Sequence, residues 1–204
     1  NKAYSSILKN LPYLLSTDLR TYECIKTDKF TDETALYIVN PKVPNILMPR
    51  QDIYAGSHVL FCQSKFEFTI QEMLKCKKHN NYYNSLIPDL YNHVGPTTAK
   101  VIVNRGIGCF QREPKLVEKQ TVTLVPEDER HGFSFKLDDD LFISTESTYH
   151  PAYLYNRKPI AIQIKDDMSR LLYEKMEELK LTDADIVQIN TDSITFYETP
   201  NLNI

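Results

Sequence analysis

The 204-residue sequence lacks several features that would place it quickly in a class of proteins. It has no apolar run near the ~18 residues that a membrane-spanning helix requires. Its longest apolar runs are strand-sized, so we expect no membrane partner. Its four cysteines are widely spaced and form no Cys-x-x-Cys pair. This spacing argues against a structural zinc site and favours an intracellular, reducing compartment.

A strong charge of either sign is also missing. The formal net charge is −3, with 24 basic and 27 acidic side chains, whereas a free-standing nucleic-acid-binding protein is more often basic. The composition, 42% hydrophobic and 25% charged, is ordinary for a globular protein. The first residue is Asn rather than Met, so we expect an excerpt of a longer protein or a processed product.

The order of the expected elements predicts an α+β protein. Helical spacing appears over about 69–94, and Pro96 opens a further helix that ends at Pro114. The most regular helix covers about 159–180, where apolar residues trace one stripe. Because helices interrupt two β-rich parts, we expect a helical subdomain inserted into a sheet domain. Strands are expected around residues 22–25, 35–39, 59–62, 66–70, 117–125, 133–137 and 141–143.

The strongest local pattern lies near the end of the sequence. Two β-prone runs, 186–189 and 194–196, flank the polar stretch 190–193, which is typical of a β-hairpin. The hairpin would hold the Asp192 carboxylate at a rigid tip, where it could bind a hard cation such as Mg²⁺. An Asp in such a place more commonly serves the turn itself, so this pattern alone leaves both interpretations open.

Two further segments carry candidate binding residues. Lys100, Asn104 and Gly108 are spaced four apart and therefore share one face of a helix, which could hold a triphosphate. An exposed Lys on an ordinary helix is the simpler interpretation. Near the start, Tyr4 and Ser6 combine an aromatic ring with a hydroxyl group, although an isolated Tyr is more commonly part of a core.

Taken together and in this order, the three segments resemble the motifs of family B DNA polymerases. Residues 2–7, Lys-Ala-Tyr-Ser-Ser-Ile, are similar to the end of Asp-x-x-Ser-Leu-Tyr-Pro-Ser-Ile. Residues 100–108 are similar to Lys-x-x-x-Asn-Ser-x-Tyr-Gly, and residues 188–193 to Tyr-x-Asp-Thr-Asp-Ser. The helix at 164–170 also looks like the family's. The compact spacing resembles the protein-primed branch of phages, linear plasmids and viral or mobile elements.

The resemblance implies a polymerase palm, built of an antiparallel sheet with packed helices, and an inserted helical fingers subdomain. Residues 1–68 and 115–204 would be the palm, and residues 69–114 the fingers. The implied activity is DNA-directed DNA polymerisation, in which dNTPs are added to a primer 3′ end by two-metal nucleotidyl transfer. The implied partners are primer–template DNA, dNTPs and, as a further candidate, a terminal protein primer. A viral protein would act in the host cytoplasm or nucleus.

The resemblance also assigns roles to individual residues. Asp192 would be the catalytic metal ligand and Asn190 a second ligand, for two Mg²⁺ ions that Mn²⁺ could replace. Tyr4 would be the steric gate under the sugar, which selects dNTPs over rNTPs. The remaining nucleotide-binding residues are Ser6 and Lys100, which would support the triphosphate, and Asn104 and Gly108, which would line the nucleotide-facing side of the fingers helix.

Departures from the motifs keep other functions open. The first-motif Asp would lie two residues before Asn1, and Asn190 stands where the third motif has its first Asp. The excerpt alone is therefore expected to be inactive. An alternative function is a catalytically degenerate polymerase-like module used for DNA binding or scaffolding. A third hypothesis, an unrelated α+β domain with chance matches, predicts that Asp192, Tyr4 and Lys100 lie far apart.

Overall fold

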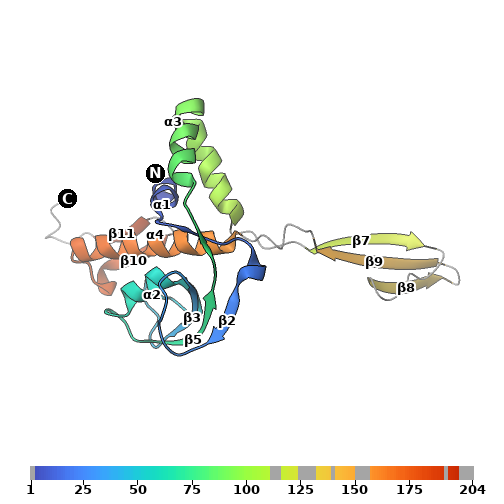
Figure 1. The fold of residues 1–204 in the computed structure, drawn as a ribbon, viewed down its shortest axis with the longest axis horizontal. Coiled ribbons are helices and arrows are strands. Elements are labelled where there is room, and N and C mark those ends of the chain that lie inside the picture. The colour runs from blue at the N-terminus through green and yellow to red at the C-terminus, as the bar shows by residue number, and fades with distance from the viewer. Residues whose placement is uncertain are drawn as a thin grey trace. The chain divides into compact units, whose positions relative to one another are not determined.

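The chain folds into two compact units, which are described separately (Figure 1). The first unit is Asn1–Gln111 with Arg157–Ile204, and the second is Arg112–Asn156. The expected α+β class is confirmed, because α-helices accompany antiparallel sheets. For the strands between residues 116 and 149, only the backbone is described. The structure, a computed structural model, describes residues 3–110, 116–123, 132–138, 141–149, 157–190 and 193–197.

The first unit contains a four-stranded antiparallel sheet with the strand order β2-β5-β3-β4. β3 lies inside the sheet and pairs with both β4 and β5. Its side chains Tyr37 and Val39 are both fully buried, as the two-residue period of a strand dictates for one face. The elements are β2 (Glu23–Lys26), β3 (Leu36–Pro41), β4 (Asp52–Ala55), α2 (Gly56–Cys62) and β5 (Phe68–Lys75).

The helix α2 replaces a strand that the sequence predicted at residues 59–62. α2 buries Val59 and Cys62, three residues apart, and leaves Leu60 exposed, which is helical periodicity. A short run of consecutive apolar residues does not distinguish a strand from a helix, so the prediction was wrong. The helix begins at Gly56, whose N–H donates a 2.8 Å hydrogen bond to the Ala35 carbonyl.

The strand β5 occupies part of the region where helical spacing was expected. Ile70 and Met73 are both buried although they are three residues apart, which resembles one face of a helix. The pairing explains this spacing: Ile38 is opposite Glu72 while Val39 is opposite Ile70, so Gln71 is an extra residue in β5. Such a bulge shifts the alternation of side chains by one residue. The helical spacing expected over about 69–94 is therefore wrong where β5 lies, up to Lys75.

Three helices form a second core in the first unit. α1 packs against α3 and α4, and α3 also packs against α4. In the described part of the chain, no helix is long and apolar enough to cross a membrane. The helices are α1 (Ala3–Asn10), α3 (Tyr83–Phe110) and α4 (Lys158–Glu178). Their shared core includes Ile7, Leu8, Val103, Ile107, Ile164 and Met168.

α3 is divided into two arms by a kink at Gly95 (Figure 1). Gly95 has φ 77° and ψ 161°, a backbone conformation that is essentially confined to glycine. Pro96 follows directly and begins the second arm, as the sequence predicted. Both arms line one small apolar cavity. Its lining includes Ile87 from the first arm and Ile107 from the second. The expected end at Pro114 lies outside the described residues.

Two short antiparallel pairs complete the first unit. β10 (Ile186–Asn190) pairs with β11 (Ser193–Phe196), which confirms the predicted hairpin. Asn190 is opposite Ser193 in this pairing. Residues 191 and 192, and with them the predicted metal ligand Asp192, lie outside the described residues. The second pair is β1 (Leu14–Leu15) with β6 (Lys78–His79), and short 3₁₀ turns cover Leu19–Thr21 and Asp183–Asp185.

The second unit is a three-stranded antiparallel sheet with the strand order β7-β9-β8. Strands expected from the sequence within residues 117–143 are confirmed here. β9 is the central strand and pairs along most of its length with both neighbours. The strands are β7 (Leu116–Thr123), β8 (Gly132–Asp138) and β9 (Leu141–Tyr149).

Candidate functional site

A cavity of about 240 Å³ lies where α1, α4, the hairpin and the loop before β4 meet. Tyr4 comes from α1, Asn190 from the end of β10, and Ile46 from the loop. Lys165 and Ser169 come from α4 and are one helical turn apart. The first and last parts of the sequence therefore contribute to the same site, which we call the first cavity.

Tyr4 reaches this cavity because α1 is fixed against the beginning of α3. The Asn81 amide donates hydrogen bonds to the carbonyls of Leu8 at 2.8 Å and Leu11 at 2.9 Å. The same side chain accepts a 2.9 Å bond from the Tyr83 N–H. One buried amide thus connects the end of α1 to the start of α3. Tyr4 is half-buried and packs against the helical core.

The hairpin presents polar groups to the cavity. Asn190 is exposed, and its Oδ1 accepts a 2.9 Å hydrogen bond from Nε2 of Gln188. Ile189 also lines the cavity and is 40% exposed. The amide oxygen of Asn190 is uncharged, but it can coordinate a hard cation.

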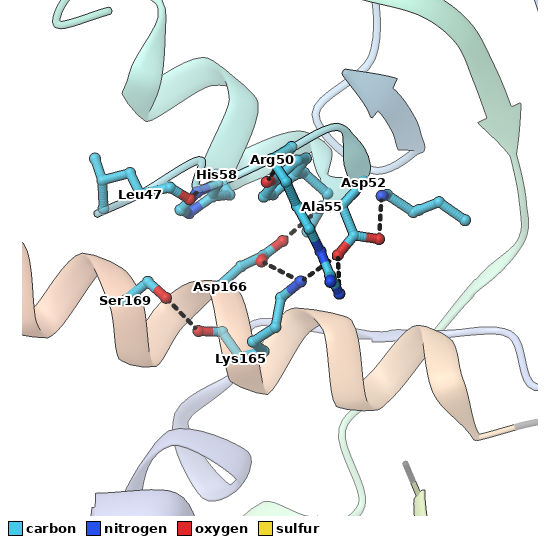
Figure 2. Close-up of polar contacts among 10 residues, drawn as sticks. Leu47, Arg50, Asp52, Ala55, His58, Lys165, Asp166 and Ser169 are labelled. Carbon is cyan, nitrogen blue, oxygen red and sulfur yellow. Dashed lines mark hydrogen bonds and ion pairs between the residues drawn. The ribbon is translucent and has the colours of Figure 1, made fainter. Parts of the chain in front are cut away.

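Lys165 is the cationic group of the first cavity. Figure 2 shows its side chain extending from α4 toward Asp52 of β4. The ammonium lies 3.5 Å from Asp52 Oδ2 and 3.9 Å from Asp166 Oδ1, and 5.1 Å from the centre of the Tyr54 ring. Burial alone would raise the pKa of Asp52, but the Ile53 N–H and the Lys165 ammonium lower it below its ordinary value.

A second cavity of about 300 Å³ adjoins the first. The two cavities share Ile46, Lys165 and Ser169, so Lys165 stands at their junction. Arg50 and Asp52 line the second cavity but not the first. The Arg50 guanidinium is 3.6 Å from Asp52 Oδ2, and its side chain is 78% exposed.

Asp166 joins α4 to the four-stranded sheet beneath these cavities. Its carboxylate accepts a 2.7 Å hydrogen bond from the Ala55 N–H (Figure 2), and the residue is only 1% exposed. Burial raises the pKa of Asp166 to about 7, although the Lys165 ammonium opposes the shift. The carboxyl group is therefore partly protonated at neutral pH.

His58 fixes the loop that lines both cavities. Its Nε2 lies 3.0 Å from the Leu47 carbonyl oxygen, and burial lowers the pKa of His58 to about 4. The ring is therefore neutral at pH 7, with Nε2–H donating to Leu47. Asn45 Oδ1 accepts hydrogen bonds from the Leu47 N–H at 3.0 Å and the Met48 N–H at 2.8 Å. These contacts hold the loop at Ile46.

The predicted site residues are only partly brought together. Tyr4 and Asn190 line the first cavity, whereas Ser6, Lys100, Asn104 and Gly108 do not. Ser6 is exposed on α1 and accepts a 3.4 Å bond from Asn10. On the second arm of α3, Lys100 is half-buried and both Asn104 and Gly108 are exposed. Their nucleotide-binding roles stay predictions, as does the role of Asp192.

Sequence reasoning missed Lys165, Asp52 and Asp166. Lys165 and Asp166 lie outside the apolar stripe from which this helix was predicted. Gln163 and Asp166 are polar residues that α4 buries, and the sequence pattern gives no signal of this burial. Gln163 accepts a 3.0 Å bond from the Leu15 N–H and donates a 3.2 Å bond to the Tyr13 carbonyl.

The described residues contain no cluster of three or more His, Cys, Asp or Glu side chains that could hold a metal ion. The magnesium ligands expected from the sequence are Asn190 and Asp192, of which Asp192 lies outside the described residues; a bound nucleotide would supply further oxygens. Such a ligand set is compatible with Mg²⁺, which is commonly held by one or two carboxylates and substrate phosphates.

Comparison of the chain with family models, with curated proteins and with solved structures found no match.

Proposed function

We propose that the chain is the palm-and-fingers core of a family B DNA-directed DNA polymerase. In this proposal the four-stranded sheet and the hairpin with α1 and α4 belong to the palm, and the two arms of α3 form the fingers. The fingers then begin at Tyr83 rather than at the expected residue 69, because β5 belongs to the sheet. The reaction is attack of a primer 3′-oxygen on the α-phosphate of a dNTP, with pyrophosphate as the leaving group.

One observation carries the proposal: Tyr4 and Asn190 line one cavity. They belong to the first and third motif-like segments, which lie at opposite ends of the sequence. Chance matches to unrelated motifs give no reason for these segments to meet at a cavity. Their meeting therefore favours a polymerase over an unrelated α+β domain.

Each residue has a chemical role in this proposal. The Tyr4 ring lies under the sugar and leaves no room for a 2′-hydroxyl group. Lys100 supplies a point charge to the triphosphate. Mg²⁺ ions held by Asp192 and Asn190 would, when bound, stabilise the charge on the attacking and leaving oxygens. The chain's remaining task is to orient the substrates, which dominates phosphoryl-transfer catalysis.

Primer extension by the full-length protein encoded by the gene tests the proposal. We expect Asp192→Ala to abolish extension, because it removes the charged metal ligand. Glu178→Ala is the matched control, since Glu178 is an exposed carboxylate at the far end of α4, paired with Lys175. Equal extension by the unmodified protein and the Asp192→Ala variant would overturn the proposal.

Sugar selection tests the role of Tyr4. Tyr4→Ala is expected to raise rNTP incorporation relative to dNTP incorporation, whereas Tyr4→Phe keeps the ring and the selectivity. Tyr82→Ala is a suitable control, because Tyr82 is a 53% exposed ring directly before α3 that lines neither cavity. An unchanged ratio in the Tyr4→Ala variant would exclude the gate.

A second candidate function is a catalytically degenerate polymerase-like module that binds DNA or serves as a scaffold. Asn190 favours it, because an amide lacks the charge of the usual Asp and holds a divalent cation more weakly. The gene sequence discriminates directly: an Asp encoded two residues before Asn1 supports the enzyme, and any other residue supports the module. Restoring the charge with Asn190→Asp should raise extension by an active enzyme.

A further inference from the structure

The two cavities that meet at Lys165 form one path along α4, with largely apolar walls and a cationic junction. Their volumes, about 240 and 300 Å³, each lie at or below the lower end of typical small-molecule sites. Tyr4 lies at the first cavity and Arg50 at the second, with Lys165 between them. An extended ligand that occupies both cavities suits this arrangement better than a compact one.

The ammonium at the junction has capacity for another partner. Its distances to Asp52 and Asp166, 3.5 and 3.9 Å, exceed the ~2.7–2.9 Å of a well-formed charge-assisted hydrogen bond. Arg50 is a second cation, also 3.6 Å from Asp52. Because Asp166 is partly protonated at neutral pH, the two cations are not fully neutralised by the two carboxyl groups.

We propose that the two cavities hold the last two nucleotides of the primer strand just after nucleotide addition, when the new nucleotide still lies above Tyr4, and that the Lys165 ammonium binds the phosphodiester between them. Lys165 is then a strand-positioning residue, with Arg50 facing the next phosphate along the strand. A strand carries one phosphate between each pair of nucleotides, which matches one cation at the junction of two cavities. The inference rests on the proposed function, because that function supplies the nucleic-acid ligand.

Titration of the chain with the thymidine dinucleotide TpT, followed by NMR of the backbone amides, tests this placement. We expect shifts in residues 45–54 and 165–169. A second titration uses TpT with a neutral methylphosphonate in place of its phosphodiester. The unmodified chain should bind this analogue about two- to fivefold more weakly, the scale of a partly exposed ion pair.

The Lys165→Gln variant separates the ammonium from the rest of the site. It should bind TpT and the methylphosphonate analogue equally, whereas Lys165→Arg should restore the difference. With a longer oligothymidylate, loss of one phosphate contact should reduce the slope of log affinity against log salt by about 0.7. Lys175→Gln is the control, because Lys175 lies on the same helix and pairs with Glu178.

Three outcomes would overturn the inference. One is that Lys165→Gln leaves the discrimination between TpT and its analogue intact. Another is that the amide shifts map away from the two cavities. The third is that the variant weakens binding of dTTP but not of TpT, which would assign Lys165 to the triphosphate instead.

A second variant guards against loss of the fold. Arg50→Gln alters a largely exposed side chain and should weaken binding of an oligothymidylate while the amide spectrum stays that of a folded protein. Unchanged affinity in this folded variant would remove Arg50 from the path. Failure of the proposed function is distinguishable, because primer extension can be absent while TpT still binds at Lys165.

Discussion

The carboxylate of Asp166 accepts a 2.7 Å hydrogen bond from the backbone N–H of Ala55, which lies 111 residues earlier in the sequence. Ala55 ends β4, and its N–H is directed at the helix α4 (Figure 2). Together with the Lys165–Asp52 ion pair, this contact connects the sheet to α4. The stability of the candidate site therefore depends on a buried carboxyl group.

Removing this acceptor should destabilise the fold. Asp166→Ala leaves the Ala55 N–H buried without a partner, which should reduce the free energy of unfolding by about 1–3 kcal/mol. Asp166→Asn keeps an acceptor oxygen and should lose less. Urea denaturation of both variants measures the difference, and equal losses would show that the hydrogen bond contributes little.

Asp166 should also make stability fall as pH rises. Burial raises its pKa from 3.8 to about 7, so between about pH 4 and 7 the folded chain keeps a proton that the unfolded chain releases. The stabilisation is complete below pH 4 and is lost as pH rises through 7. The side chain at position 166 of the Asp166→Asn variant cannot titrate. As pH rises from about 4 to 7, the unfolding free energy of this variant should therefore increase relative to that of the unmodified protein. A difference that is constant with pH would contradict the raised pKa.

His58 should act in the opposite direction. Burial lowers its pKa from 6.5 to about 4, so the unfolded chain takes up a proton that the folded chain refuses. The stabilisation is present above pH 6.5 and is lost as pH falls toward 4. In the Asp166→Asn background, which removes the competing titration, His58→Gln should lose less stability over this range than the protein with His58. Parallel urea midpoints at pH 4, 5.5 and 7 would refute this.

The elements that sequence predicted well are those whose pattern is local. The hairpin at 186–196 and the helix α4 each carry their full periodicity within one segment. The predictions for the segments of α2 and β5 were wrong because the secondary structure of these segments depends on distant partners. The spacing of Ile70 and Met73 comes from a bulge opposite β3, and nothing within residues 68–75 specifies that bulge.

The same physics limits prediction of the site. Tyr4 and Asn190 became candidates because each lies in a segment that resembles a polymerase motif. Lys165 and Asp166 could not be found, because their partners Asp52 and Ala55 lie more than a hundred residues away. A Lys-Asp pair on a helix predicts an exposed surface unless the sheet that covers it is known.

Gly56 should be intolerant of any side chain. A Cβ at this position would lie 2.6 Å from the Glu33 carbonyl oxygen and 2.7 Å from that of Asp32, so backbone would have to move. Gly56→Ala should therefore reduce the free energy of unfolding by about 1–3 kcal/mol. Gly106→Ala is the matched control, because, apart from neighbouring residues and the backbone of its own helix, nothing lies within 4 Å of its added Cβ. That variant should gain about 0.5–1 kcal/mol, since Ala favours a helix interior over Gly.

Denaturant midpoints of these two variants should move in opposite directions. If both variants lose stability equally, the contact at Gly56 is not the cause.

Asn81→Asp should be more damaging than its small change in shape suggests. The Asn81 amide donates to the Leu8 and Leu11 carbonyls, and an ionised carboxylate cannot donate to either. It would instead place a negative charge against two carbonyl oxygens in a buried position, with an expected loss of about 3 kcal/mol or more. Asn81→Ala removes the donors without adding the charge, so it should be the milder change.

The loss in Asn81→Asp should also depend on pH. A protonated carboxyl group regains one donor, so the variant should recover part of its stability as pH falls toward 4, whereas Asn81→Ala should show no such recovery. Thermal denaturation of the two variants at pH 4 and 7 measures this. Because this amide fixes α1, the same variant should weaken the sugar selection that we propose for Tyr4 while leaving the hairpin folded. Normal selection in a destabilised Asn81→Asp protein would show that Tyr4 is positioned by other contacts.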